Sequence, residues 1–125
     1  MGLDMYAYTT AEKVETDTDF FVEARTEIAY WHKFKFNALH GWMQNLYYSK
    51  GGKSDEFNCD NVRIDLDDLD DLEEVLKEGL LRPVDGFFFG SQTVEPEDVE
   101  SAQEFIGKAR AAIAEGLTVY YLAWR

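Results

Sequence analysis

Cysteine, proline and long apolar runs are scarce in this sequence. Cys59 is the only cysteine among 125 residues, so no disulfide can form within the chain, and we expect a reducing cytoplasm. Two prolines argue against a linker-rich or low-complexity protein. No apolar stretch approaches the roughly 20 residues that cross a bilayer, and no basic segment followed by an apolar one resembles a secretory signal. We therefore expect no association with a membrane.

Basic residues are also few, with 12 Lys and Arg against 25 Asp and Glu, which leaves a net charge of -13. Such a chain repels phosphate backbones and anionic lipid, which excludes direct nucleic-acid binding through a basic surface. Strong acidity permits a partner with a basic surface, but it also serves simply to keep a small protein soluble. The charge alone leaves both roles open.

Apolar and aromatic residues are plentiful, at 46% and 15% of the chain. This content is too high for a disordered protein, and the length is that of one domain. We therefore expect residues 1–125 to form a single compact domain.

Alternation of apolar and polar residues predicts strands at residues 3–10, 26–31, 62–66 and 117–124. Apolar residues at three- and four-residue steps predict three helices, with Asn37 and Asp67 as the N-caps of the first two and Pro96 at the start of the third. Gly51 and Gly116 are placed to end the first and last of these helices. The pattern predicts an α+β fold, with about three helices on one mostly antiparallel sheet of about four strands. The first and last strands should pair in its middle.

Three segments together resemble a family of small bacteriophage and prophage proteins. They are the opening Met-Gly-Leu-Asp-Met-Tyr, the middle segment from Glu27 through the residues around His40, and the Gly-Phe-Phe-Phe-Gly-Ser run of residues 86–91. The resemblance covers most of the chain. This sequence departs from the family pattern at His32, where Arg is common, and at residues 34–36, where smaller residues are usual. The resemblance implies an accessory protein acting in the cytoplasm of a bacterial host, and its motifs carry no chemistry of their own.

Aromatic residues with a few polar neighbours form the first candidate site, because small-ligand pockets have this composition. The candidate ligand-binding residues are Glu27, Tyr30, Trp31, Lys33, His40, Trp42, Phe88 and Ser91. The hypothesis requires the triple-phenylalanine run to meet Trp42 in space. If the second strand also approaches the first helix, Glu27 and His40 could form an acid–base pair. The alternative is that the aromatic rings only fill the core and that His40 is a hydrogen-bonded residue at its boundary.

The acidic run around Asp67 is a second candidate, for a divalent cation. It comprises Asp65, Asp67, Asp68, Asp70 and Asp71. Its spacing does not fit an EF-hand, and a helix would point these side chains around its axis. The alternative is a solvated helix start whose negative charges favour the helix dipole. His32, His40 and Cys59 lack the close spacing of zinc ligands, so we expect no metal and no cofactor.

No sequence motif of a hydrolase, and no phosphate-binding glycine loop with its lysine, is present, so we expect no catalytic residues. Two acidic helix faces are suited to a basic protein. The preferred hypothesis is a non-catalytic acidic binding protein with a protein partner. The alternative is a small-molecule-binding protein or minor enzyme that uses the aromatic residues around Glu27, Tyr30, His40 and Trp42. Self-association through an edge strand or the phenylalanine run stays open.

Overall fold

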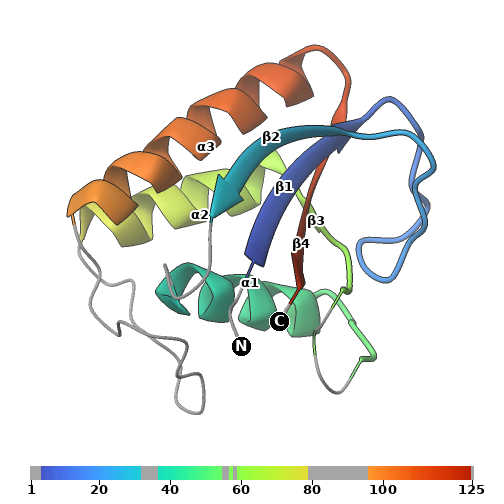
Figure 1. Ribbon diagram of the computed structural model, residues 1–125, viewed down its shortest axis with the longest axis horizontal. Coiled ribbons are helices and arrows are strands. Elements are labelled where there is room, and N and C mark those ends of the chain that lie inside the picture. The colour runs from blue at the N-terminus through green and yellow to red at the C-terminus, as the bar shows by residue number, and fades with distance from the viewer. Residues whose placement is uncertain (1–3, 32–36, 55–56, 58, 79–95, 125) are drawn as a thin grey trace.

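The computed structural model describes residues 4–31, 37–54, 57, 59–78 and 96–124 (Figure 1). The strands in these ranges are β1 (Asp4–Thr10), β2 (Thr26–Trp31), β3 (Val62–Ile64) and β4 (Thr118–Trp124). The helices are α1 (Asn37–Ser49), α2 (Leu66–Lys77) and α3 (Pro96–Ala114). Within the described ranges, no helix is long and apolar enough to cross a membrane. The elements follow one another in the order that the sequence periodicity predicts.

The four strands form one antiparallel sheet in the order β2-β1-β4-β3. Strands β1 and β4 pair along their whole length, from Asp4 opposite Trp124 to Thr10 opposite Thr118. This confirms the predicted α+β class and the predicted pairing of the first and last strands in the middle of the sheet. Because β1 and β4 each have two neighbours, β2 and β3 are the edge strands.

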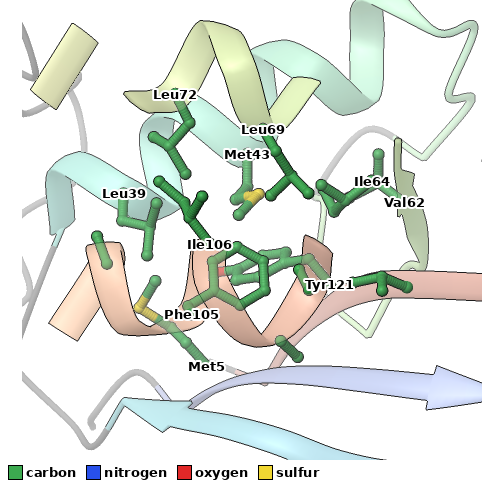
Figure 2. Close-up of a cluster of buried hydrophobic side chains, with 14 of the residues drawn as sticks. Met5, Leu39, Met43, Val62, Ile64, Leu69, Leu72, Phe105, Ile106 and Tyr121 are labelled. Atoms are coloured by element: carbon green, nitrogen blue, oxygen red, sulfur yellow. The ribbon is translucent and has the colours of Figure 1, made fainter. Parts of the chain in front are cut away.

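The three helices pack on one face of the sheet (Figure 1). Alternate residues of the central strands point towards them, including Met5 and Ala7 on β1 and Val119 and Tyr121 on β4. Burying one large apolar side chain contributes about 1.5–3 kcal/mol, so the two layers are held together mainly by this packing. The helix residues that complete this core include Leu39, Met43, Leu69, Leu72, Phe105 and Ile106 (Figure 2).

Glycines end two of the helices, as the sequence predicts. Gly51 follows α1 with φ 95°, and Gly116 follows α3 with φ 87°. After α3, the N–H of Leu117 donates to the carbonyl of Ala112 at 3.0 Å. This bond satisfies a backbone carbonyl that has no partner within the last turn of the helix. The turn requires positive φ at residue 116, which glycine tolerates. Both turns send the chain back towards the sheet.

Helix α2 begins earlier than the sequence analysis expects. The expected N-cap, Asp67, lies inside the first turn, and the N-cap is Asp65. The Asp65 side chain accepts the N–H of Asp68 at 2.9 Å, and the Asp68 side chain accepts the N–H of Asp65 at 2.9 Å. Asp67 and Asp70 are separated by three residues, as Asp65 and Asp68 are, so the capping pattern alone does not show whether Asp65 or Asp67 is the N-cap. The start at Asp65 turns the leucines of α2 to the core and makes Leu66 an exposed helix residue instead of a strand residue.

The other face of the sheet carries tyrosines. The ring centroids of Tyr6 and Tyr8 on β1 are 5.7 Å apart, and those of Tyr8 and Tyr120 are 5.5 Å apart. Phe20, from the loop of residues 11–25, packs edge-on against Tyr120 at 5.3 Å. The Arg25 guanidinium of the same loop lies 4.1 Å from the centroid of the Tyr8 ring. This loop therefore covers part of the face that the helices leave open.

The same loop also covers one edge of the sheet. The N–H of Arg63 on β3 donates to the carbonyl of Asp17 at 2.8 Å, and Thr18 forms a β-bridge with Val62. Nothing in the sequence pattern predicts this attachment. Strand β3 is thus paired on both sides, and β2 is the edge that lies beside α3.

Candidate functional site

Three of the predicted site residues come together on β2, where the strand faces α3. Glu27 and Tyr30 line a groove of about 380 Å³, and Trp31 lies next to them at the end of the strand. The remaining lining residues are Ile28 and Ala29 from β2 and Ser101, Glu104, Phe105 and Lys108 from α3. The groove therefore combines the edge of a sheet with the side of a helix.

Trp31 joins β2 to α3 at this groove. Its indole N–H donates to the Ser101 hydroxyl at 2.6 Å, and its ring packs edge-on against Phe105 with the centroids 5.5 Å apart. Ser101 and Phe105 are four residues apart and so share one face of the helix. A buried indole N–H requires such a partner. Because Trp31 is only 6% exposed, it serves as an anchor of the groove rather than as a surface for a ligand.

The groove contains two carboxylates and one ammonium group. Glu27 lies on β2, and Glu104 lies on α3. Lys108 Nζ is 3.3 Å from Glu104 Oε1, and it donates to the backbone carbonyl of Ile28 at 3.4 Å. The side chains of Lys108 and Glu104 are 52% and 69% exposed, so their ion pair contributes little to stability. Because Lys108 offsets the charge of only one carboxylate, the lining residues of the groove have a net negative formal charge.

The Tyr30 ring contacts residues on the outer face of the sheet. Its centroid is 5.0 Å from that of Tyr6, and its hydroxyl donates to the Asp4 carboxylate at 3.0 Å. Desolvation and this hydrogen bond raise the pKa of Tyr30 to about 12, so the phenol keeps its proton at neutral pH. The side chain is 44% exposed. The Tyr30 ring therefore lies on the outer face beside the groove, and its phenol is not suited to proton transfer.

His40 and Trp42, on α1, do not line the groove. His40 is fully buried, with Nδ1 2.7 Å from the Tyr121 hydroxyl and its ring stacked on Phe57 at 5.3 Å. Desolvation raises the pKa of Tyr121 well above its usual value, so this hydroxyl stays neutral. Trp42 is half-buried against the core. The structure thus places His40 inside the core and Glu27 at the surface, and it does not bring the two together as an acid–base pair.

Lys33, Phe88 and Ser91 lie outside the described residues, as does the rest of the triple-phenylalanine run. The expectation that this run meets Trp42 therefore stays a prediction. The site that can be built from the described residues is the groove between β2 and α3.

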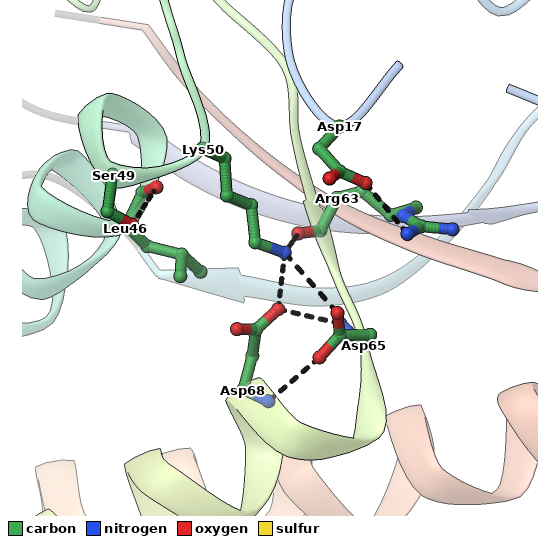
Figure 3. A network of polar contacts seen from close by, with 7 residues as sticks. All are labelled: Asp17, Leu46, Ser49, Lys50, Arg63, Asp65 and Asp68. Atoms are coloured by element: carbon green, nitrogen blue, oxygen red, sulfur yellow. Dashed lines mark hydrogen bonds and ion pairs between the residues drawn. The ribbon is translucent and has the colours of Figure 1, made fainter. Parts of the chain in front are cut away.

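Lys50 binds the acidic cluster at the start of α2. Its ammonium contacts the Asp68 carboxylate, donates to the carbonyl of Arg63 at 2.6 Å and lies 3.7 Å from Asp65 (Figure 3). Burial raises the pKa of Asp68, although the hydrogen bond from the Asp65 N–H and the ammonium of Lys50 both act to lower it. Burial also acts to raise the pKa of Asp65, but hydrogen bonds with Asp68 and the charge of Lys50 bring it below its usual value. These two carboxylates therefore act as a helix cap and an ion-pair partner.

The rest of the acidic cluster is spread around α2. Asp67 and Asp71 are exposed, and Asp70 binds Arg110 of α3 at 2.7 Å. Arg110 also binds Glu73 at 2.9 Å, and these carboxylates raise the pKa of the guanidinium. Within the described residues, no group of three or more His, Cys, Asp or Glu side chains could hold a metal ion. The carboxylates of α2 thus connect neighbouring elements or face solvent.

Sequence analysis missed the α3 side of the groove. The residues that it did not name are Ser101, Glu104, Phe105 and Lys108. A signal was present, because Ser101, Phe105 and Lys108 are spaced by four and three residues, as on one face of a helix. What the spacing could not reveal is that this face lies beside β2.

Comparisons with known proteins add no assignment to this geometry. No protein-family model matches the chain. No curated protein matches it, and no solved structure does.

Proposed function

We propose that this protein is a non-catalytic binding protein, and that its partner is another protein with a basic surface. The observation that supports this most strongly is the groove between β2 and α3, where an edge strand lies beside a helix and each of the two elements carries an exposed carboxylate, Glu27 on β2 and Glu104 on α3. Its resemblance to phage and prophage proteins supports a role as an accessory protein in the bacterial host cell.

The composition of the groove favours binding over catalysis. Its one tyrosine stays protonated, its one lysine is paired with Glu104, and the buried histidine lies elsewhere. General acid–base catalysis needs a group that titrates near the working pH beside a substrate. The described part of the groove offers carboxylates and backbone instead, which are recognition groups for a polypeptide.

The acidic helices support the choice of a basic partner. Helices α2 and α3 lie side by side and are tied together by Arg110 (Figure 1). Negative potential over such a surface speeds the encounter with a positive partner and excludes acidic ones. The exposed carboxylates on these helices include Asp67, Asp70, Asp71, Glu74, Glu97, Glu100 and Glu104.

Affinity capture with two matched variants tests this function. The groove variant, Glu27→Gln with Glu104→Gln, and the control variant, Asp71→Asn with Glu115→Gln, remove the same charge from exposed positions. We expect the wild-type protein to retain a stoichiometric protein from a bacterial lysate at low salt and to lose it at high salt. We expect the groove variant to retain much less of it than the control variant does.

The captured protein is then purified and mixed with the wild-type chain, and the complex is measured by size-exclusion chromatography with light scattering. A defined complex with a basic protein supports the proposal. If no stoichiometric partner is retained at low salt, or if the retained partner is acidic and insensitive to salt, the proposal is wrong.

A small-molecule-binding protein is the second candidate. The groove volume of about 380 Å³ is within the range of about 300–1,000 Å³ that ligand pockets occupy. Binding of a small molecule there should raise the unfolding temperature of the wild-type protein and of the control variant but not of the groove variant. A library screen by thermal shift on these three proteins would separate this candidate from the first.

A further inference from the structure

The two edges of the sheet are not equivalent. Beyond β3, the loop of residues 11–25 supplies a further hydrogen bond and a β-bridge. Beyond β2, no strand is present in the described part of the chain, and Lys108 reaches across to the carbonyl of Ile28. An edge strand presents a row of backbone donors and acceptors, which is a template for another strand. Strand β2 is therefore the edge at which a further strand can add.

The groove lies beside this edge and has the form that strand addition uses. In strand addition, an extended segment bonds to the backbone of an edge strand and places alternate side chains in neighbouring pockets. Here the backbone of Glu27 through Tyr30 forms one side, and Ser101, Glu104 and Lys108 stand on the facing helix. From Ala29 to Trp31, β2 pairs with β1 in regular register, and the register shifts between Ala29 and Glu27, which leaves Ile28 as an extra residue of β2. The regular template for an added strand is therefore the segment from Ala29 to Trp31.

The charges of the groove indicate which segment fits. Glu104 stands on α3, whereas Glu27 pairs with Tyr8 of β1 and so lies on the tyrosine-bearing face of the sheet; Lys108 pairs with Glu104. An added strand places its side chains alternately on these two faces. A second copy of the chain would bring its own Glu27 and a further net charge of -13 to this edge, so pairing of β2 with β2 is unfavourable. A basic segment complements both carboxylates. Its backbone N–H can also replace the weak contact of Lys108 with Ile28.

From these observations, and on the basis of the protein-binding function proposed above, we infer that β2 binds an extended basic segment of the partner as a fifth strand of the sheet. Lysine or arginine side chains of that segment contact Glu27 and Glu104. Lys108 covers the Ile28 carbonyl in the free protein and moves aside on binding.

Fluorescence anisotropy with a defined peptide tests the inference. The probe is a fluorescein-labelled peptide of about ten residues in which pairs of lysines alternate with pairs of threonines, so that lysines point to both faces of the extended chain. It is long enough to extend past β2 at about 3.3 Å per residue. A second peptide carries N-methyl groups on its central backbone amides, which keeps every charge but removes the donors of a strand. We expect the second peptide to bind about tenfold more weakly, because the hydrogen bonds to β2 are lost.

The two charge-matched double variants separate local from general attraction. We expect the groove variant, Glu27→Gln with Glu104→Gln, to bind the first peptide about tenfold more weakly. We expect the control variant, Asp71→Asn with Glu115→Gln, to change the affinity by about twofold or less. Unfolding curves of both variants show whether each one is folded. Equal losses in the two variants, or equal binding of the two peptides, would overturn strand addition.

Lys108→Met gives an independent test. The substitution uncovers the Ile28 carbonyl and removes a positive charge, so we expect the lysine peptide to bind several-fold more tightly. Weaker binding would overturn the role of Lys108 as a cover.

Hydrogen exchange of β2 amides should slow on addition of the peptide. Slow exchange already in the free protein, together with a monomeric mass, would mean that the chain covers this edge itself and would overturn the inference.

These outcomes also separate the inference from the function on which it depends. If affinity capture yields a basic partner while both double variants bind the peptide equally, the partner binds elsewhere on the acidic surface. The function then stands and strand addition fails. If neither a partner nor the lysine peptide is bound, both fail.

Discussion

Gly52 has no space for a side chain, because a Cβ atom there would collide with the buried ring of Tyr47. The ring cannot move easily, since its hydroxyl donates to Asp19 at 2.5 Å and accepts the N–H of Ser54 at 2.9 Å. We expect Gly52→Ala to lower the free energy of unfolding by about 1–3 kcal/mol, the usual cost of overpacking. Urea denaturation measures it. Gly107→Ala is the control, because no neighbouring group lies within 4 Å of its Cβ, and it should stabilise α3 by about 0.5–1 kcal/mol. Equal effects at the two positions would contradict this interpretation.

The same tyrosine gives a prediction for alkaline pH. Burial and the bond to Asp19 raise the pKa of Tyr47 from 10.0 to about 12. Between these values the unfolded chain loses the phenol proton while the native protein keeps it, so stability falls as pH rises. We expect Tyr47→Phe to be less stable at neutral pH but to lose stability less steeply from pH 10 to 12. The slopes should differ by up to about 1.4 kcal/mol per pH unit. Denaturation curves across this range measure both slopes, and parallel slopes would contradict the prediction.

At the scale of elements, Lys50 links the end of α1 to the start of α2. The side chains of Lys50 and Asp68 are only 12% and 11% exposed. We expect Lys50→Met to lower the free energy of unfolding by about 2–4 kcal/mol, because it leaves the Asp68 carboxylate enclosed without its cation. Asp68→Asn in the same chain should restore part of this loss, with a coupling of about 0.5–3 kcal/mol.

A double-mutant cycle by urea denaturation measures that coupling. Lys77→Met is the matched control, because its contact with Glu73 is long, at 3.7 Å, and its side chain is 65% exposed. Additive effects of Lys50→Met and Asp68→Asn would show that the two side chains do not stabilise each other.

Most elements could be predicted because their signals are local. The strand of residues 26–31 is rich in β-favouring residues, and the helix that begins at Pro96 starts and stops with residues suited to those positions. The start of α2 was misplaced because three-residue spacing occurs at both Asp65 and Asp67, and only the packing of the leucines distinguishes them. The pairing of β1 with β4 was predicted because a chain with a strand near each end satisfies both most simply in the centre of a sheet.

The site was less predictable because it depends on contacts between distant segments. Glu27, Tyr30 and Trp31 were named from their own strand, but the α3 side of the groove is set by the bond between Trp31 and Ser101, far apart in sequence. For His40, the alternative of a hydrogen-bonded residue at the core boundary is nearer to the structure than the pocket hypothesis, although the side chain is fully buried. Its burial against Tyr121 could not be known, because an amphipathic pattern does not show which strand a helix face meets.

The whole molecule carries a net charge of -13, and its excess carboxylates repel one another in the compact state. We expect added sodium chloride to raise the unfolding temperature by a few degrees, because screening weakens this repulsion more than it weakens the ion pairs between described residues. Scanning calorimetry at low and moderate salt measures the shift. Asp71→Asn with Glu115→Gln should show a smaller shift than the wild-type protein, and a fall in the unfolding temperature with salt would contradict the prediction.

The central position of β1 and β4 has a consequence for synthesis in the cell. The ribosome releases β1 early and β4 late, since the chain emerges from its N-terminal side. Until β4 emerges, β1 lacks one neighbour and the core lacks Val119, Tyr121 and Ala123. Translation of nearly all the described chain must therefore precede closure of the sheet, which leaves the nascent polypeptide open to chaperones and proteases until β4 is released.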